Sequence, residues 1–225
     1  MRPLYRDLVL FAVAAAAGML TTSVVVHALR SPTRGLPWSD RFADGDASSW
    51  VAYDGNWNIQ SRVMVNESNE RGAKLVAGSP YWENYALDGD TALSDSGDAG
   101  LIARVSDPEP GVDSYSGIYV GLRVRDEVLV VGVANHGWDE EQAKSLPHPI
   151  VSGAWYHIRL ELRGKRLTAL TWPEGQPNNF VRLDKTLSDM PRRGKIGLRS
   201  YDCGGKWKNI RVTELRDDNQ EFVEK

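Results

Sequence analysis

Two patterns of hydrophobic and polar positions divide this chain. Residues 8–29 (LVLFAVAAAAGMLTTSVVVHAL) form a continuous apolar run in which His27 is the only titratable side chain. From Trp38 onward, short runs of alternating apolar and polar residues are separated by clusters of Asp, Gly, Asn, Ser and Pro. Alternation with a period of two predicts strands, because successive side chains of a strand point to opposite faces. The patterns therefore predict one N-terminal helix followed by an all-β domain.

The N-terminal apolar run is long enough to cross a membrane. As a helix it would extend about 33 Å, and a hydrocarbon core is about 30 Å thick. Arg2 and Arg6 precede it, as expected for a cytoplasmic end, although Arg30 and Arg34 follow it. Residues 1–30 are therefore interpreted as a transmembrane anchor, with the membrane as its partner.

A cleaved secretory signal is the alternative interpretation of the same segment. Residues 26–28 (VHA) would supply a small-residue cleavage site, but the apolar run is long for a signal peptide. Both interpretations place the remainder outside the cytoplasm. It would stay anchored on the periplasmic or cell-surface side, or be secreted after cleavage.

The rest of the chain is expected to contain a linker, one domain and a tail. Residues 31–37 (SPTRGLP) predict a linker because they contain two prolines and a glycine. The β-sandwich domain is expected at residues 38–216, followed by a polar tail at residues 217–225. Alternation predicts strands at residues 57–60, 62–65, 85–93, 100–105, 117–124, 127–133, 155–163, 166–172, 195–201 and 207–214. Two local features complete the prediction: a type II′ turn at residues 164–165, where Gly tolerates positive φ, and a single helical turn at residues 140–144.

Several of these strands carry arginine and tyrosine on the face opposite the predicted core. In GLIARV (100–105) and GIYVGLRV (117–124), the alternation puts Arg104, Tyr119 and Arg123 opposite the apolar positions. In KIGLRSY (195–201) it does the same for Arg199 and Tyr201. If these strands share a sheet, planar guanidinium groups and stacking rings gather on one face, with glycines leaving room for a ligand. This arrangement suits a sugar, whereas the alternative is a solvated face of paired arginines.

A loop beside the predicted hairpin adds two candidates. His136 and Trp138 lie in ANHGWDEE, which could line the rim of a pocket or pack as an ordinary loop. The predicted ligand-binding residues are therefore Arg104, Tyr119, Arg123, Arg199, Tyr201, His136 and Trp138.

Composition narrows the classes of partner. The formal net charge is −3, and lysines and arginines are scattered, which argues against binding to nucleic acid. The single cysteine, Cys203, excludes an internal disulfide and a cysteine-based metal site. Lys206 and Lys208, rather than a histidine, are its neighbours, which favours a small buried residue over a catalytic thiol.

Five segments occur in an order typical of a known superfamily. They are GNWNI (55–59), YWENYALDGD (81–90), SGDAGLIAR (96–104), GAWYHIRLELRGKRLTAL (153–170) and GKIGLRSYDCGGKWKNIRV (194–212). Together they resemble the concanavalin A-like lectin/glucanase (laminin G-like) superfamily, and within it bacterial domains related to 3-keto-disaccharide hydrolases. The resemblance implies a jelly-roll sandwich of two antiparallel sheets. It does not fix the function, because this fold hosts enzymes, lectins and adhesion modules.

The sequence lacks common signatures of catalysis. A retaining glucanase presents alternating carboxylates along one strand, whereas Asp139, Glu140 and Glu141 are consecutive and Glu161 stands alone. No Gly-x-Ser-x-Gly elbow occurs, and the histidines have no metal-pair spacing. We therefore favour a domain without catalytic residues.

No cofactor is expected, although calcium is a candidate because many members of the superfamily bind it through loop oxygens. DGDTALSDSGD holds Asp88, Asp90, Asp95 and Asp98 as potential ligands. Ala99 stands where an EF-hand needs its bidentate acid, so only another kind of loop site is possible. The alternative is a turn-rich loop of solvated acids.

The favoured hypothesis is a membrane-tethered, extracytoplasmic, lectin-like module that binds a carbohydrate or glycan without transforming it. A glycosidic hydrolase of the keto-sugar type is one alternative, with acids such as Asp139 or Glu140 acting near Arg104. A structural or protein-interaction sandwich is the other.

Overall fold

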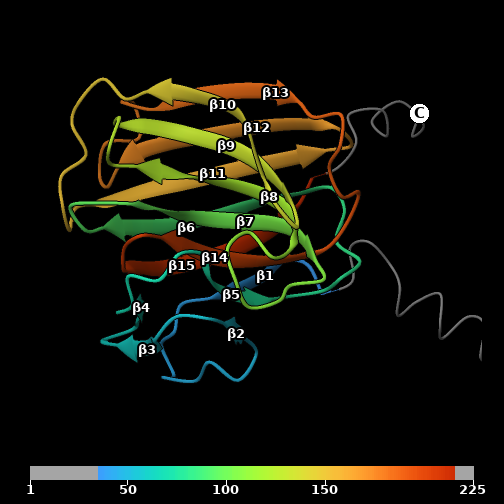
Figure 1. Cartoon of the computed structure of the whole chain (residues 1–225), viewed down its shortest axis with the longest axis horizontal. Coiled ribbons are helices and arrows are strands. Elements are labelled where there is room, and N and C mark those ends of the chain that lie inside the picture. Colours follow the sequence, from blue (N-terminus) through green and yellow to red (C-terminus); the bar gives the residue numbers. More distant parts are fainter. Residues whose placement is uncertain (1–34, 216–225) are drawn as a thin grey trace, which may run out of the picture.

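Two antiparallel β-sheets packed face to face form the domain. The structure is a computed structural model that describes residues 35–215. Figure 1 shows the two sheets as layers, with strands of similar direction in each. The described residues contain strands and turns but no helix. This confirms the predicted all-β sandwich.

The two sheets have different strand orders. Sheet A runs in the order β13 (Val181–Thr186), β12 (Arg166–Pro173), β11 (Trp155–Arg163), β6 (Tyr85–Leu93), β15 (Gly205–Glu214), β4 (Val63–Asn66) and β3 (Trp57–Gln60), and β1 (Trp38–Asp40) also pairs with β15. Sheet B runs in the order β10 (Trp138–Ser145), β9 (Val128–Asn135), β8 (Ser116–Arg123), β7 (Asp98–Ser106), β14 (Lys195–Tyr201), β5 (Ala73–Ala77) and β2 (Val51–Tyr53). Strands that are consecutive in sequence thus often lie in different sheets.

The predicted N-terminal helix lies outside the described residues. Within residues 35–215, no helix has the length and apolar character needed to cross a bilayer. The anchor or signal at residues 1–30 therefore stays a prediction.

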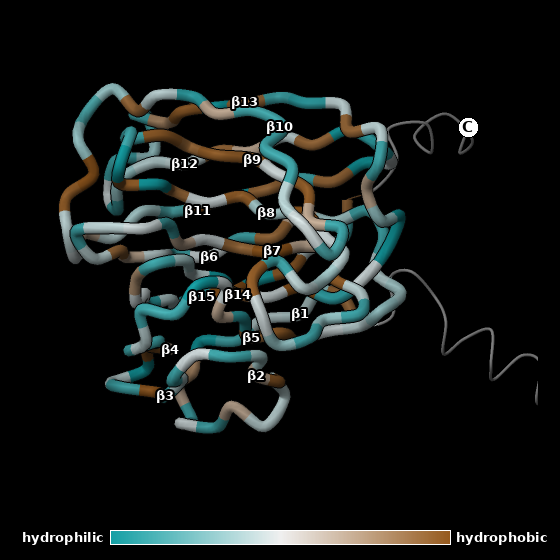
Figure 2. Tube along the Cα trace, in the orientation of Figure 1, coloured by the Kyte–Doolittle hydropathy of each residue, from teal (hydrophilic) through white to brown (hydrophobic). Residues whose placement is uncertain are grey.

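The core lies between the sheets and contains large aromatic rings. Trp82, Tyr85, Trp207 and Phe42 are at most 2% exposed and pack with the inward aliphatic residues of both sheets. Hydropathy changes from residue to residue along many strands in Figure 2, as expected for strands with one buried face. Burial of these rings together with the aliphatic side chains is the main stabilising contribution to the sandwich.

Two β-bulges change the predicted alternation. The register between β7 and β8 shifts after Ala103, and Arg104 has a φ of 50°. As a result Val105 packs on the outer side of sheet B, not beside Leu101 in the core as predicted. A second shift in β15 around Asn209, whose φ is 56°, allows Trp207 and Ile210 both to face the core. The strict alternation predicted for these two strands is therefore wrong.

Other local predictions have mixed outcomes. The helical turn predicted at residues 140–144 is wrong, because these residues belong to β10, an edge strand with mostly exposed side chains. Gly164 has a φ of 53° in the two-residue turn between β11 and β12, as the prediction of positive φ requires. Strands β1, β2, β5, β10 and β13 were not predicted.

Candidate ligand-binding site

Three neighbouring strands of sheet B position most of the predicted ligand-binding residues. In the centre of the sheet, Asp98 of β7 lies opposite Arg123 of β8 on one side and Tyr201 of β14 on the other. Two residues further along β7, Gly100 lies opposite Arg199 of β14. Because residues two apart share a face, these side chains all point away from the core. We call this group, together with Tyr119 and Trp138, the Arg199 cluster.

Arg199 is the centre of the cluster. Its side chain is 3% exposed, and its guanidinium group donates to Asp98 at 2.8 Å and to Asp113 at 2.7 Å. The guanidinium carbon lies 4.6 Å from the ring centre of Tyr119, and 5.4 Å and 5.5 Å from those of Trp138 and Tyr201. Two charge-assisted bonds and three rings therefore fix Arg199 in one position.

Burial perturbs the ionisable groups around Arg199. Desolvation raises the pKa of Asp98, even though the Arg199 charge acts in the opposite direction. Desolvation also raises the pKa of Tyr119 well above its usual value. For Arg199 itself desolvation favours the neutral form, but the charges of its neighbours outweigh it and keep the pKa raised. Arg199 thus stays charged beneath the surface.

Gly121 of β8 and Gly132 of β9 lie against aromatic rings rather than open space. A Cβ atom added to Gly121 would lie 2.0 Å from the hydroxyl oxygen of Tyr119, and one added to Gly132 would lie 2.2 Å from the Trp138 ring. Tyr119 and Trp138 also contact each other, with ring centres 5.8 Å apart. The expectation that glycines leave a low floor for a ligand is therefore corrected: the rings fill that space and form the floor themselves.

The exposed rim of the cluster is polar and aromatic. Trp138 is 38% exposed, while Tyr201 is half-buried and lies under the guanidinium group of Arg71. Arg123 bonds Asp126 at 2.7 Å and Glu140 at 2.5 Å, and these hydrogen bonds raise its pKa. A ligand reaching this face would therefore meet rings and guanidinium groups, with Arg199 and Tyr119 beneath them.

His136 lies at one end of this face. It follows β9 with a φ of 50°, its side chain is exposed, and its backbone N–H donates to the Tyr115 carbonyl. No interaction joins its side chain to Arg199 within residues 35–215. His136 is thus a rim residue of the loop and not a member of the Arg199 cluster.

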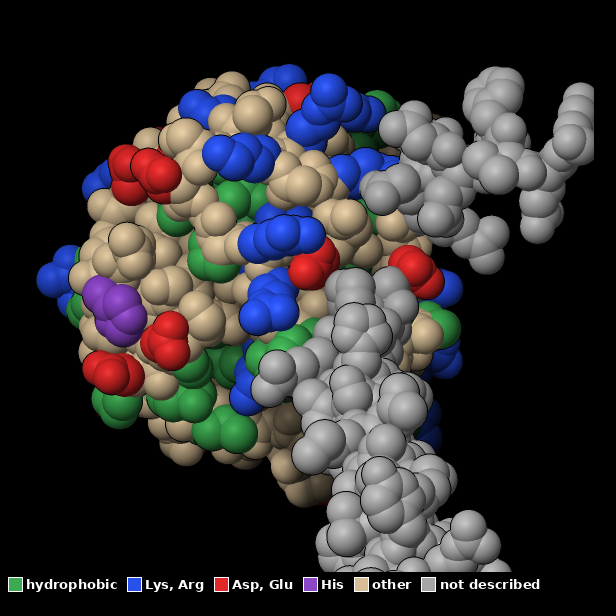
Figure 3. Space-filling view, turned by 90° about the vertical axis from the view of Figure 1, so that its right-hand side faces the viewer, with side chains coloured by type: hydrophobic (Ala, Val, Ile, Leu, Met, Phe, Trp, Pro, Cys, Tyr) green, Lys and Arg blue, Asp and Glu red, His purple; other side chains and the backbone are tan. Residues whose placement is uncertain are grey.

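Arg104 does not join the cluster, which corrects the prediction for this residue. The bulge turns its 1% exposed side chain toward the end of the sandwich, where it donates to the backbone carbonyls of Glu83, Gly164 and Pro191. Lys and Arg side chains gather on that end of the molecule (Figure 3). Arg104 therefore joins three loops together and is not available to a ligand on the face of sheet B.

A loop and a buried lysine complete the site and were missed by the sequence analysis. The loop at residues 107–115 supplies Asp113 to Arg199 and the Gly111 carbonyl to Lys74, whose ammonium group donates to it at 2.8 Å. Lys74 is fully buried, and desolvation lowers its pKa to about 8 although the Asp54 charge opposes this. The short strand β5 was not predicted. The one local signal for it is that Lys74 stands between the apolar residues Ala73 and Leu75.

The four aspartates considered for calcium do not converge. Asp88 and Asp90 bond His157 on sheet A, whereas Asp98 begins β7 in sheet B, and Asp95 lies in the loop between them. Within residues 35–215, no group of three or more His, Cys, Asp or Glu side chains is arranged to hold a metal ion. Asp88 and Asp90 share one face of β6, and the change of sheet separates them from Asp98, so the structure does not bring the four carboxylates together at one site.

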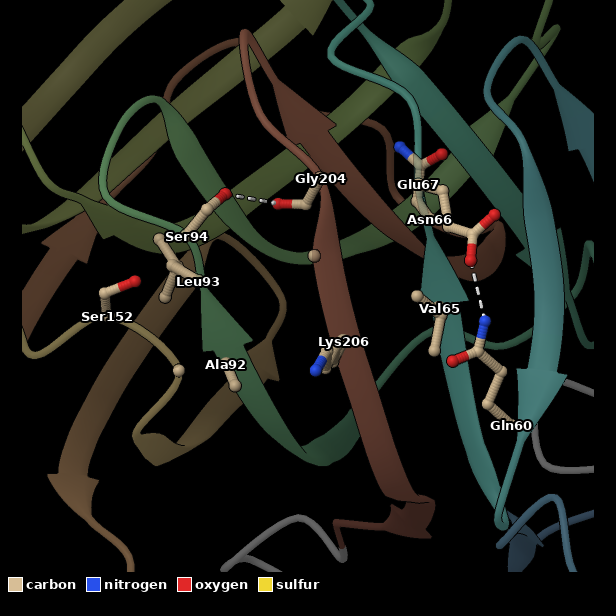
Figure 4. A pocket seen from close by; sticks show the side chains of 12 residues that line it. Gln60, Val65, Asn66, Glu67, Ala92, Leu93, Ser94, Ser152, Gly204 and Lys206 are labelled. Carbon is tan, nitrogen blue, oxygen red and sulfur yellow. Dashed lines mark hydrogen bonds between the residues drawn. The ribbon is translucent and has the colours of Figure 1, made fainter.

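Large cavities lie against sheet A. One of about 520 Å³ is shown in Figure 4, where Ser94 donates to the Gly204 carbonyl and Gln60 donates to Glu67 on the opposite side. Lys206 of β15 lies between these two pairs. A second cavity of about 520 Å³ lies beside β1 and β15. Neither contains a residue of the Arg199 cluster.

Cys203 has no catalytic environment. It is fully buried, and desolvation raises the pKa of its thiol to about 12. The interpretation of a small buried residue is confirmed.

Solved structures with similar folds include several carbohydrate-binding proteins. The carbohydrate-binding module CBM66 from Bacillus subtilis superposes with a TM-score of 0.62 at 15% identity, covering 74% of this chain and 96% of the module. The exoplasmic/lumenal domain of VIP36, in a form bound to Ca²⁺ and mannose, superposes with a TM-score of 0.59 at 15% identity, covering 84% and 90%. The lectin I-B4 from Griffonia simplicifolia gives 0.56 at 10% identity, covering 78% and 97%. These similarities show the concanavalin A-like fold.

The sequence comparisons identify the family. A search of curated proteins found no match. Residues 37–213, however, match the family described as 3-keto-alpha-glucoside-1,2-lyase-like domains. This range covers the whole described sandwich except its last residues, in agreement with the resemblance found in the sequence. The chain therefore belongs to the 3-keto-alpha-glucoside-1,2-lyase-like domain family.

Proposed function

We propose that this protein is a membrane-tethered, extracytoplasmic, lectin-like module that binds a carbohydrate on the outer face of sheet B without transforming it. The observation that carries the proposal is the Arg199 cluster, in which one buried guanidinium group holds three aromatic rings and two carboxylates in place. The similar folds of a carbohydrate-binding module and of two lectins support the same class of ligand.

The chemistry of the rim fits a sugar ring. The exposed Trp138 offers a flat apolar surface, on which the C–H face of a pyranose or furanose would stack. Arg71, which covers the Tyr201 ring, and Arg123 place donors near this surface for sugar hydroxyls, and Glu140 places an acceptor there. Because Arg199 and Tyr119 are held beneath, the platform is ordered before ligand arrives, which reduces the entropy cost of binding.

A glycan array followed by calorimetry tests the proposal. The full-length protein is screened with and without Ca²⁺, and a neutral glycan that binds is titrated into the wild type and Trp138→Ala. We expect at least a tenfold loss of affinity, because the variant removes the exposed stacking surface. Phe180→Ala is the matched control, since Phe180 is a 51% exposed ring outside the Arg199 cluster. Equal affinity of Trp138→Ala and the wild type would reject the site.

Tethering is proposed from the sequence of residues 8–29. This apolar run has the length of a membrane span and precedes a domain whose relatives in fold include an exoplasmic/lumenal one. Expression of the full chain followed by membrane fractionation and intact-mass analysis is the test. Retention in the membrane at the full mass supports an anchor, whereas a soluble product that begins after residue 28 would indicate a cleaved signal.

A second candidate function is elimination on a keto sugar, which the family favours. Such a lyase needs a base that takes the proton next to the keto carbon, while the C–O bond to the leaving alcohol breaks and a C=C bond forms. Asp98 is the matching group, because it is a carboxylate of raised pKa on the sugar-binding face. Its pairing with Arg199 at 2.8 Å opposes this role, since the pair holds the charge of the carboxylate.

The two functions give different outcomes with a 3-keto-α-glucoside. The lectin-like proposal expects binding without release of the aglycone. Release that is lost in Asp98→Asn would establish the lyase instead. If neither binding nor release occurs with any carbohydrate, the structural or protein-interaction alternative is favoured.

A further inference from the structure

A cavity on the outer face of sheet A collects charged groups that the Arg199 cluster does not use. It has a volume of about 520 Å³ and lies between β1, β6, β11 and β15, on the opposite sheet from Arg199. Its charged lining residues are Arg41, Asp88, His157, Arg159 and Arg211. The volume falls within the range of small-molecule sites.

The floor of this cavity is a network of hydrogen-bonded charges. His157 lies 2.7 Å from Asp90 and 3.2 Å from Asp88, and Arg159 donates to Asp88 at 2.8 Å and to Glu161 at 2.9 Å. Desolvation alone would lower the pKa of His157, but its bonds to the two carboxylates outweigh this and raise it to about 9. The network thus has two cations and three anions that nearly neutralise one another.

The rim of the cavity carries two arginines without partners. Arg41 and Arg211 are exposed, and neither side chain forms a hydrogen bond, an ion pair or a cation–π contact with another residue in the range 35–215. Asp88 is the residue opposite Arg211 in the register of β15 and β6, but it already binds His157 and Arg159. Among the residues that the structure describes, neither guanidinium group has a partner that an incoming anion would have to displace.

The other lining groups point to a sugar as the carrier of that anion. Ser39 and Asn209 offer a hydroxyl and an amide group, whereas the ring of Trp38 packs on the core side against Trp50 and Trp82. Asn209 is held by a bond of 2.6 Å to Asp90, which fixes its amide at the edge of the network. Guanidinium groups match the planar geometry of a carboxylate, so a uronic acid combines the features that this cavity recognises.

We propose that this cavity is a second binding site, which takes an acidic saccharide and holds its carboxylate through Arg41 and Arg211. The site does not depend on the Arg199 cluster, because the two lie on different sheets and share no residue. A neutral glycan would use sheet B and a uronide would use sheet A.

Calorimetry with trimers of galacturonate, glucuronate and mannuronate tests this proposal on the full-length protein. We expect one of them to bind, with at least a tenfold loss of affinity in the double variant Arg41→Gln/Arg211→Gln. Arg125→Gln is the matched control, because Arg125 is an exposed arginine on the β8–β9 hairpin of sheet B. We expect it to bind as the wild type does. Circular dichroism checks that the variants fold.

Two further ligands separate the possible sources of binding. The methyl ester of the binding trimer keeps the rings and removes the charge, and we expect it to bind at least tenfold more weakly. Inorganic sulfate tests for a simple anion site, and we expect it to bind more weakly than the trimer. The proposal is overturned by the absence of binding of all three trimers or by an unchanged affinity in the double variant. Equal binding of the ester, or of sulfate, would also overturn it.

Discussion

The outer faces of the two sheets show how the same pleat can lead to different surfaces. On sheet A, the charged residues are partly exposed and line large cavities, as with His157 and Arg159. On sheet B, Arg199 and Lys74 are at most 3% exposed, because Tyr119, Trp138 and the loop at residues 107–115 cover them. Both outer faces carry charged residues, and the covering rings and loop of sheet B account for the difference in their exposure.

This difference has consequences for stability and for binding. Charges beneath a cover cannot be hydrated, so each depends on its partners, and removing one leaves the others uncompensated. Charges beside a cavity keep water as an alternative partner, and a ligand can replace that water. The stability of sheet B should therefore respond more strongly to substitution of its buried charged residues, and sheet A more strongly to ligands.

Arg199→Met is expected to have the largest effect on folding. It leaves the carboxylates of Asp98 and Asp113 buried without their cation, and breaking such a pair costs about 3–5 kcal/mol. Urea unfolding followed by tryptophan fluorescence measures the loss. Arg123→Gln is the control on the same face, with an expected loss of about 1 kcal/mol or less, because its partners are exposed. Equal losses in both variants would refute the distinction between buried and exposed pairs.

His157 is expected to give sheet A a pH-dependent stability. Its pKa is about 9 in the folded state and about 6.5 in the unfolded chain, so the stabilisation is complete below pH 6.5 and is lost as pH rises through 9. The full loss is roughly 3 kcal/mol, given 1.36 kcal/mol per pKa unit. The groups that face His157 are Asp88, Asp90 and the stacked Trp172. His157→Gln should remove this slope between pH 6.5 and 9, and a slope that persists would contradict the assignment.

Lys74 is expected to give sheet B a stability that changes with pH in the opposite direction to that from His157. Its pKa is about 8 when folded and about 10.5 when unfolded, so the unfolded chain binds more protons between these values. The free energy of unfolding should therefore rise with pH between about 8 and 10.5, by at most roughly 3 kcal/mol. The surrounding charges are Asp54, Arg199 and Asp113. Unfolding of Lys74→Met across this range should lack the rise, and an unchanged rise would assign it to another group.

Gly132→Ala is expected to have the smallest effect on stability and to act on the floor of the cluster. The added methyl group would lie 2.2 Å from the Trp138 ring, which must move, at a cost of about 1–3 kcal/mol. Gly137→Ala is the matched control, because nothing lies within 4 Å of its added carbon. Thermal unfolding and the quenching of Trp138 fluorescence compare the two. If both variants match the wild type, Trp138 does not rest on Gly132.

The sequence predicted the sandwich because long strands with one apolar face dominate it. Strands β8 and β11 follow strict alternation, and Tyr119 and Arg123 of β8 point outward as the pattern predicts. The short strands β2 and β5 and the charged edge strand β10 lack that signal. Strands β2 and β5 pair with distant segments, which a local pattern does not contain, and β10 pairs with the adjacent β9 but has almost no buried face.

The candidate site was predicted in part for the same reason. Arg199, Tyr119 and Tyr201 follow from alternation, and the structure brings them together with Trp138. Arg104 was misplaced because a bulge with positive φ reverses the alternation, and no glycine in the sequence marks it. Tertiary contacts, rather than local sequence, also bring Asp113 to Arg199.

The most direct test of the account is to follow the indole N–H resonances of Trp138 and Trp172 by NMR while a neutral glycan from the array is added. Trp138 belongs to sheet B, and Trp172 stacks on His157 in sheet A, 4.3 Å between ring centres. We predict that the Trp138 resonance shifts in proportion to saturation while that of Trp172 stays unchanged. A shift of Trp172 with a stationary Trp138 would contradict the placement of the carbohydrate site on sheet B.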